Sequence, residues 1–147
     1  SPPDGPPQPC RTDQLVAALE ASPAPGPGRG AATVVLTNLT SAPCTLVGYG
    51  GVSLRRSDGG PVPSSQVRAP EPAPARVVLA PGRGVRSTIT WATVADAAVG
   101  EPAEGPCEPA PTTLQVIPPN QVPQLAVPWT AGPVCSQGTL TQTAYAG

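Results

Sequence analysis

The sequence predicts an all-β protein, an antiparallel β-sandwich of about eight short strands. Three observations lead to this prediction. Runs rich in β-branched residues recur at spacings of roughly 8–15 residues, with glycine- or proline-containing turns between them. Few segments show the apolar period of an amphipathic helix. Four cysteines can staple a small core.

The length of 147 residues fits one domain, which we place at residues 10–147. Residues 1–9 contain five prolines and predict an extended, disordered spacer. The strands of the domain are predicted at residues 33–39, 44–49, 52–54, 76–79, 85–91, 113–117, 124–129 and 139–145. Ser57 to Gly60 predicts a hairpin turn after the third of these strands.

Two segments have open interpretations. Thr12 could cap a helix within residues 11–22, whereas the alternation of Leu15, Ala17 and Leu19 is typical of a strand. Residues 61–75 form a proline-rich loop, which is either a recognition loop or a variable insertion.

The composition indicates a folded chain with a small core. Proline and glycine make up 40 of the 147 residues, and Val, Leu and Ile together only 28. Disorder with this composition would require a high net charge, but the net charge is only −1. Four cysteines in such a chain predict a disulfide framework in an oxidising, extracytoplasmic compartment, with three possible pairings.

Missing residue types exclude several classes of function. The chain has no His and no Lys, which excludes a Ser-His-Asp triad, a Walker-type phosphate loop and a Schiff-base lysine. The chain contains no CxxC motif, so nothing in it indicates a metal cluster. The eight arginines are too scattered along the sequence for a nucleic-acid-binding surface. We interpret Glu101, Glu104 and Glu108 as a solvated acidic surface. The sequence therefore predicts a non-enzymatic protein without cofactor or metal.

Other features bear on localisation. No apolar stretch is long enough to span a membrane, and the first residue, Ser1, suggests that a signal peptide or lipid-anchored leader has been removed. Membrane contact is expected only through such an anchor.

The sequon Asn38-Leu39-Thr40 is interpreted as a turn asparagine rather than a glycosylation site.

Three sequence blocks carry a family resemblance. In residues 36–54, LTNLTSAPCTLVGYGGVSL, a strand ending in Thr-Asn leads through a loop to Cys-Thr-Leu-x-Gly-Tyr and then Gly-Val-x-Leu. Residues 77–91 contain a Leu-x-Pro-Gly turn and a strand ending in Trp, and residues 107–119 form the third block. In these blocks the chain resembles the actinobacterial secreted domains and lipoproteins called domain of unknown function 4232.

The resemblance implies an immunoglobulin-like sandwich that is secreted or carried on a lipoprotein at the outer face of the plasma membrane. It also implies a strand within residues 11–22 and the sequential pairs Cys10–Cys44 and Cys107–Cys135. Gly50 stands where the family more often has Pro. The resemblance supplies no catalytic residue.

The expected function is protein–protein interaction with an unidentified protein of the cell envelope, by a domain tethered to the membrane. The alternative is a secreted module that binds a small molecule, a lipid or a glycan, which would require an exposed aromatic side chain beside a pocket. Candidate ligand contacts are the aromatic residues Tyr49 and Trp129, which lie near irregular backbone, and the adjacent pair Arg55 and Arg56.

Overall fold

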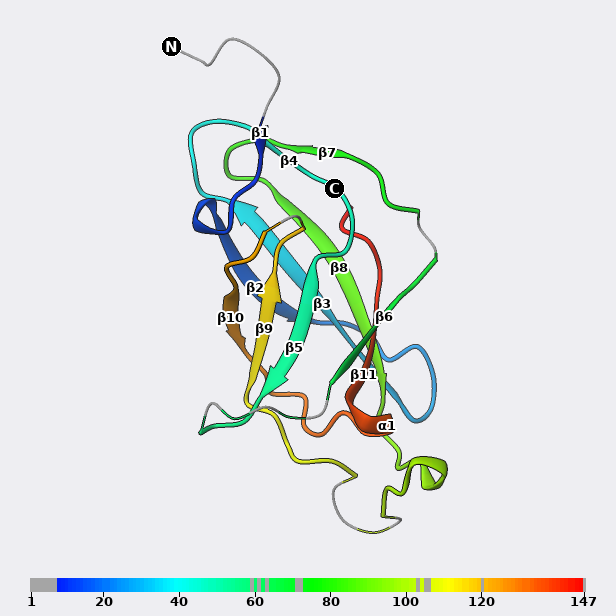
Figure 1. Cartoon of the computed structure of the whole chain (residues 1–147). Coiled ribbons are helices and arrows are strands. Elements are labelled where there is room, and N and C mark those ends of the chain that lie inside the picture. Colours follow the sequence, from blue (N-terminus) through cyan, green and yellow to red (C-terminus); the bar gives the residue numbers. More distant parts are fainter. Residues whose placement is uncertain are drawn as a thin grey trace.

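The computed structural model describes residues 8–58, 60, 62, 64–70, 73–102, 104, 107–119 and 121–146. These residues are mostly β, as predicted (Figure 1). The strands are β1 (Gln8–Pro9), β2 (Leu15–Ala21), β3 (Arg29–Asn38), β4 (Cys44–Leu46), β5 (Gly51–Arg55), β6 (Ser65–Arg68), β7 (Val77–Leu79), β8 (Gly84–Ala92), β9 (Thr113–Ile117), β10 (Leu125–Pro128) and β11 (Thr139–Gln142). The short helical turns are η1 (Thr12–Gln14), η2 (Ala97–Val99) and α1 (Cys135–Gly138).

The strands form three sheets. The largest has the order β2-β3-β8-β11-β6, the second has the order β10-β9-β5, and the smallest has the order β1-β4-β7. Most neighbouring strands are antiparallel, but β11 pairs with β6 and β1 pairs with β4 in parallel. Two of the three sheets are therefore mixed, which corrects the predicted antiparallel sandwich, whereas the β10-β9-β5 sheet is purely antiparallel.

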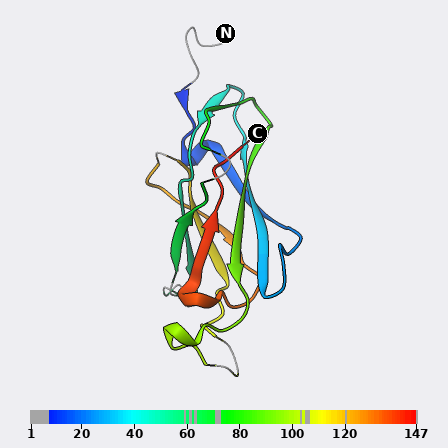
Figure 2. The ribbon, with the colours of Figure 1, turned by 90° about the vertical axis from the view of Figure 1, so that its right-hand side faces the viewer.

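The two larger sheets face each other across a common core. Alternation along β3 shows how the sequence builds it, because Val34, Leu36 and Asn38 are buried while the residues between them are half-buried. At the sheet edges, β2 lies against β10 and β6 against β5. Figure 2 shows the red strand β11 between β8 and β6, so the large sheet curls toward the smaller one.

The structure corrects the predicted strand inventory. There are eleven strands among the described residues, in three sheets, instead of eight. The predicted turn after residues 52–54 is present, because Arg56 N–H donates to the Gly60 carbonyl and Val62 N–H to the Leu54 carbonyl. The strand that pairs with β5 is nevertheless β9, which lies far along the sequence. Residues 61–75, predicted as a loop, contain β6. This strand was missed because its register depends on a parallel partner, β11, that no local pattern reveals.

Residues 11–22 form mainly a strand. β2 pairs with β3 along its whole length, and the single turn η1 precedes it. The alternating positions Leu15, Ala17 and Leu19 all pack on the core, which explains why the strand is preferred over a helix. Of residues 1–9, the structure describes only Gln8 and Pro9, which pair with β4.

Two disulfides fasten the connections. Cys10–Cys44 joins the segment after β1 to β4, and Cys107–Cys135 joins the long connection between β8 and β9 to α1. These are the sequential pairs implied by the family resemblance, and no cysteine is free. Within the described part of the chain, no helix is long and apolar enough to cross a membrane.

Candidate functional site

The four candidate contact residues do not converge on one site. Trp129 is only 3% exposed, and its ring centroid lies 4.8 Å from that of Trp91 in the core. Its indole N–H donates to the carbonyl of Gly132. Trp129 is therefore a core residue in this structure, and it offers no ring face to a ligand.

Arg55 and Arg56 lie at the end of β5 that is remote from Tyr49. The Arg55 guanidinium donates to the side-chain carbonyl of Gln115 at 3.0 Å. Arg56 pairs with Asp58 at 3.5 Å across an exposed turn. Each of these arginines thus has a partner within the fold, at a distance from the cleft described next.

Tyr49 lies in the wall of an open cleft of about 440 Å³. The cleft is formed by the β4–β5 connection, the end of β6 and the segment after β9. Its lining residues are Val47, Gly48, Tyr49, Gly50, Gly51, Arg68, Pro74, Ile117, Pro118 and Gln121. Tyr49 is only 9% exposed. The guanidinium of Arg68 stacks over its ring, with the central guanidinium carbon 5.3 Å from the ring centroid. We call this the Tyr49 cleft.

The position of Tyr49 is fixed by hydrogen bonds at both ends of the residue. Its hydroxyl donates to the carbonyl of Ala69, and its own carbonyl accepts from the buried side-chain amide of Gln142 at 2.9 Å. The flanking carbonyls of Gly48 and Gly50 accept from Tyr145 N–H and from the Gln66 side chain. The aromatic ring is therefore a rigid platform rather than a mobile side chain.

Gly50 allows the β4–β5 connection to approach β9. Its φ is +66°, and a Cβ atom at this position would lie 2.1 Å from the carbonyl oxygen of Ile117. Proline cannot adopt a positive φ, because its ring holds φ near −65°. Glycine at position 50 therefore determines the shape of this wall of the cleft.

Two further hollows adjoin the Tyr49 cleft at Gln121. One, of about 350 Å³, lies between η1 and the start of β10. The other, of about 410 Å³, lies beside β1. Val122, the residue after Gln121, is 88% exposed. We refer to the Tyr49 cleft and these two hollows together as the Gln121 surface. Its lining residues come from β1, η1, the β4–β5 connection, the end of β6 and the β9–β10 connection, and Figure 1 shows β1 and β4 at one end of the molecule.

The acidic residues near Cys107 are not all solvated as expected. Glu101 is only 7% exposed, and its carboxylate accepts from the N–H groups of Asp96, Ser136 and Gln137 at 2.8–3.1 Å. Ser136 and Gln137 both have a φ of 56°, which aims their N–H groups at the same carboxylate. The prediction of a solvated surface is wrong for Glu101, although Glu104 is exposed.

The carboxyl groups of Glu101 and Glu108 form a hydrogen-bonded pair. A hydrogen bond from Glu108, together with the backbone N–H groups, lowers the pKa of Glu101 to about 2 despite its burial. The same hydrogen bond, with desolvation and the charge of Glu101, raises the pKa of Glu108. The pair thus favours one shared proton.

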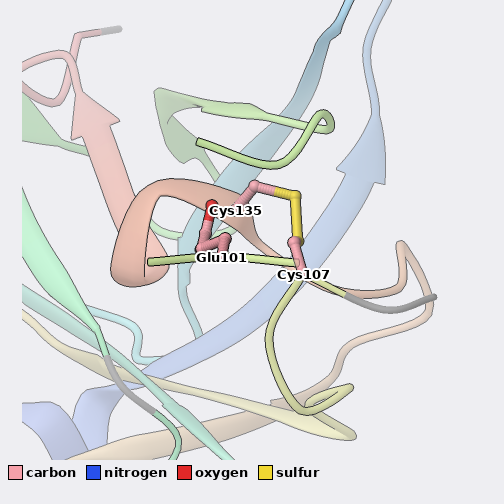
Figure 3. Close-up of side chains that lie close together, drawn as sticks. All are labelled: Glu101, Cys107 and Cys135. Carbon is pink, nitrogen blue, oxygen red and sulfur yellow. A yellow bond between two sulfur atoms is a disulfide. The ribbon is translucent and has the colours of Figure 1, made fainter. Parts of the chain in front are cut away.

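Glu101, Cys107 and Cys135 lie close together, but their oxygen and sulfur atoms are already engaged in other bonds. Figure 3 shows the Glu101 side chain beside the Cys107–Cys135 disulfide. A carboxylate oxygen of Glu101 and the two sulfur atoms all lie within 4.8 Å of one another. The two sulfurs are joined as a disulfide, and metals bind thiolates. The oxygens of Glu101 are occupied by backbone N–H groups, so this constellation locks α1 to the β8–β9 connection.

Asn38 of the sequon is fully buried. Its amide donates to the carbonyls of Ala42 and Leu79 at 2.9 and 3.0 Å, and its side-chain oxygen accepts from the N–H and hydroxyl of Thr40. The interpretation as a turn asparagine agrees with this geometry.

Comparison with known proteins gives the family. The family model described as Domain of unknown function (DUF4232) matches residues 10–146. The chain belongs to this family. No curated protein and no solved structure matches this DUF4232 domain.

The sequence singled out Tyr49 but not the residues that surround it in the DUF4232 domain. Arg68 was hidden in the proline-rich loop and Gln121 in an apparent turn region, and Ile117, although placed at the end of a predicted strand, had no predicted link to Tyr49. Only the pairing of β6 with β11 and of β9 with β5 brings them to the Tyr49 cleft. No periodicity or motif in the sequence contains that information.

Proposed function

We propose that this DUF4232 domain is a non-enzymatic, extracytoplasmic module of the cell envelope that acts by protein–protein interaction, held near the membrane, and that its docking site is the Gln121 surface. The observation that carries the proposal is the set of three hollows adjoining at Gln121. An extended segment of a partner protein fits such a row better than a compact ligand does. Arg68 lines the Tyr49 cleft, whose described lining contains no acidic residue, and this suits an acidic segment, whereas Arg11 in the second hollow is already paired with Asp13.

Exposed apolar side chains on the same surface support this proposal. Val122 is almost fully exposed, and Val47 at the rim of the Tyr49 cleft is exposed as well. Apolar side chains within a polar rim are typical of protein interaction sites.

The fold also supports it. We infer that the two larger sheets form an immunoglobulin-like sandwich, to which β1, β4 and β7 add a third, small sheet. Sandwich domains present binding loops at their ends, and the Gln121 surface lies at one end. Two disulfides suit an oxidising compartment. The acidic pair at Glu101 and Glu108 is bonded to backbone and to itself, which is the geometry of a structural lock.

The alternative function, binding of a small molecule, lipid or glycan, rests on the Tyr49 cleft alone. Its volume of about 440 Å³ lies in the range of small-ligand sites. The low exposure of Tyr49, 9%, weighs against stacking on a sugar, and the Arg68 guanidinium already lies over the ring.

Site-specific photocrosslinking in cells of the source organism tests the proposal. A photoreactive residue at Val122 should give one discrete, reproducible protein adduct. The same residue at Val94 is the control. This side chain is 60% exposed and follows β8, and Figure 1 shows that the connection after β8 lies at the opposite end of the molecule from β1. Equal labelling from both positions would contradict the proposal, and adducts only with lipid or glycan would favour the alternative.

A further inference from the structure

We propose that Arg68, stacked on Tyr49, is the receptor for a carboxylate group of the segment that docks on the Gln121 surface. The inference rests on the proposed function and adds the chemistry that the partner must carry. It arises from the position of one guanidinium rather than from the cleft as a whole.

The charge state of the cleft is the first step. Among the described residues, ion pairs engage Arg11, Arg56 and Arg86, and hydrogen bonds engage Arg29 and Arg55. No carboxylate or other acceptor within this part of the chain bonds the guanidinium of Arg68. Its donors are therefore available at the mouth of the Tyr49 cleft.

The rigidity of the support is the second step. Arg68 ends β6, whose register with β11 places it opposite Gln142, and the next N–H, of Ala69, donates to the Gln142 carbonyl at 2.8 Å. The side-chain amide of Gln142 in turn donates a hydrogen bond to the carbonyl of Tyr49. Backbone and ring are thus fixed relative to each other, and a guanidinium stacked on a ring keeps its edge free for an acceptor.

The shape of the guanidinium is the third step. Its planar fork of N–H donors matches the two oxygens of a carboxylate in a bidentate pair. Ile117, Pro118 and Pro74 line the cleft beside it and provide apolar contact for the carbon atoms next to that group. A carboxylate on a peptide, either at the chain end or on an acidic side chain, satisfies both features.

Two arginines provide a matched comparison. Arg83 is exposed in the turn between β7 and β8, and it also has no side-chain partner among the described residues. It differs from Arg68 in lying outside the cleft and away from any ring. Arg83→Gln therefore removes the same charge as Arg68→Gln without touching the proposed receptor.

NMR titration of the ¹⁵N-labelled domain tests the proposal. Acetylalanine carries a chain-end carboxylate, acetylaspartyl amide carries a side-chain carboxylate, and acetylalanine amide carries neither. We expect at least one carboxylate probe to shift the amide signals of Gly48, Gly50 and Gly51 and the Arg68 Nε–H signal in a saturable way. The stronger of the two identifies the source of the carboxylate.

The variants sharpen the result. Arg68→Gln should weaken binding of the responding probe at least tenfold, Arg68→Lys should recover only part of it, and Arg83→Gln should change it less than twofold. Equal shifts with acetylalanine amide would overturn the proposal. So would unaltered binding by Arg68→Gln, or a stronger response to inorganic phosphate than to both carboxylates. Because crosslinking from Val122 does not depend on a carboxylate, its outcome separates failure of this inference from failure of the proposed function.

Discussion

Substitution of Gly50 by alanine tests the geometry of the Tyr49 cleft. Two costs follow from the structure. A φ of +66° costs a residue with a Cβ about 1–2 kcal/mol, of which about 0.4–1 kcal/mol is recovered because alanine restricts the unfolded chain. The new Cβ would also lie 2.1 Å from the carbonyl oxygen of Ile117, so that the backbone of one of the two residues must move.

Overpacking of this kind costs about 1–3 kcal/mol. We therefore expect Gly50→Ala to lower the free energy of unfolding by about 3 kcal/mol in total. For a domain of this size, that corresponds to a decrease in Tm of about 6–12 °C. Urea unfolding followed by tryptophan fluorescence measures it well, because the two tryptophans, Trp91 and Trp129, are both in the core.

Gly82 supplies the matched control. Its φ is +75°, and no atom lies within 4 Å of a Cβ built on it. Gly82→Ala should therefore show only the dihedral cost, a loss of about 1 kcal/mol or less. Equal losses for the two variants would refute the claim that Ile117 closes on Gly50, and so would a loss below about 1 kcal/mol for Gly50→Ala.

Three further perturbations have defined outcomes. Replacing Cys107 and Cys135 by serine should cost about 4 kcal/mol of unfolding free energy, since the pair closes a loop with a sequence separation of 28 residues; an unchanged urea midpoint would contradict this. Glu101 has a lowered pKa, so its ionised form stabilises the fold above the unfolded pKa, and this stabilisation is lost as pH falls toward 2. Glu108 has a raised pKa, so its protonated form stabilises the fold at low pH, and this stabilisation is lost as pH rises. Glu108→Gln, which donates at every pH, should therefore raise Tm at pH 8 but not at pH 3, and a gain at both would argue against the shared proton. Asn38→Ala should cost about 2–4 kcal/mol in urea unfolding, because two carbonyls lose their donors; a loss within 0.5 kcal/mol, roughly a surface effect, would be inconsistent with this.

The sequence predicts those parts of the fold that depend on local patterns. Alternation of β-branched and polar residues locates β3, β8 and β9, whose cores are built from residues such as Val34, Ile89 and Val116. The same logic shows why the helix alternative at residues 11–22 could not be decided locally. Leu15 and Leu19 suit either period, and only pairing with β3 selects the strand.

Pairing between distant segments is what the sequence cannot reveal. β6 has few apolar residues and prolines on both sides, so its pattern resembles a loop. It becomes a strand because β11 offers a parallel partner and because Gln66 bonds Gln142 across the pair. Similarly, the burial of Glu101 depends on the left-handed backbone at Ser136 and Gln137, which side chains with a Cβ rarely adopt.

The same distant pairing assembles the candidate site. Gln142 is completely buried, and its side chain accepts from Gln66 of β6 while it donates to the carbonyl of Tyr49. A buried amide is tolerated only when its donors and acceptors are satisfied, and here the bonding partners are the two segments that carry Arg68 and Tyr49. The buried Gln142 and the proposed receptor, Arg68 on Tyr49, are therefore linked through the same hydrogen bonds. Arg68 and Tyr49 meet at the Tyr49 cleft because the hydrogen bonds that satisfy the buried Gln142 side chain also join β6, β11 and the β4–β5 connection.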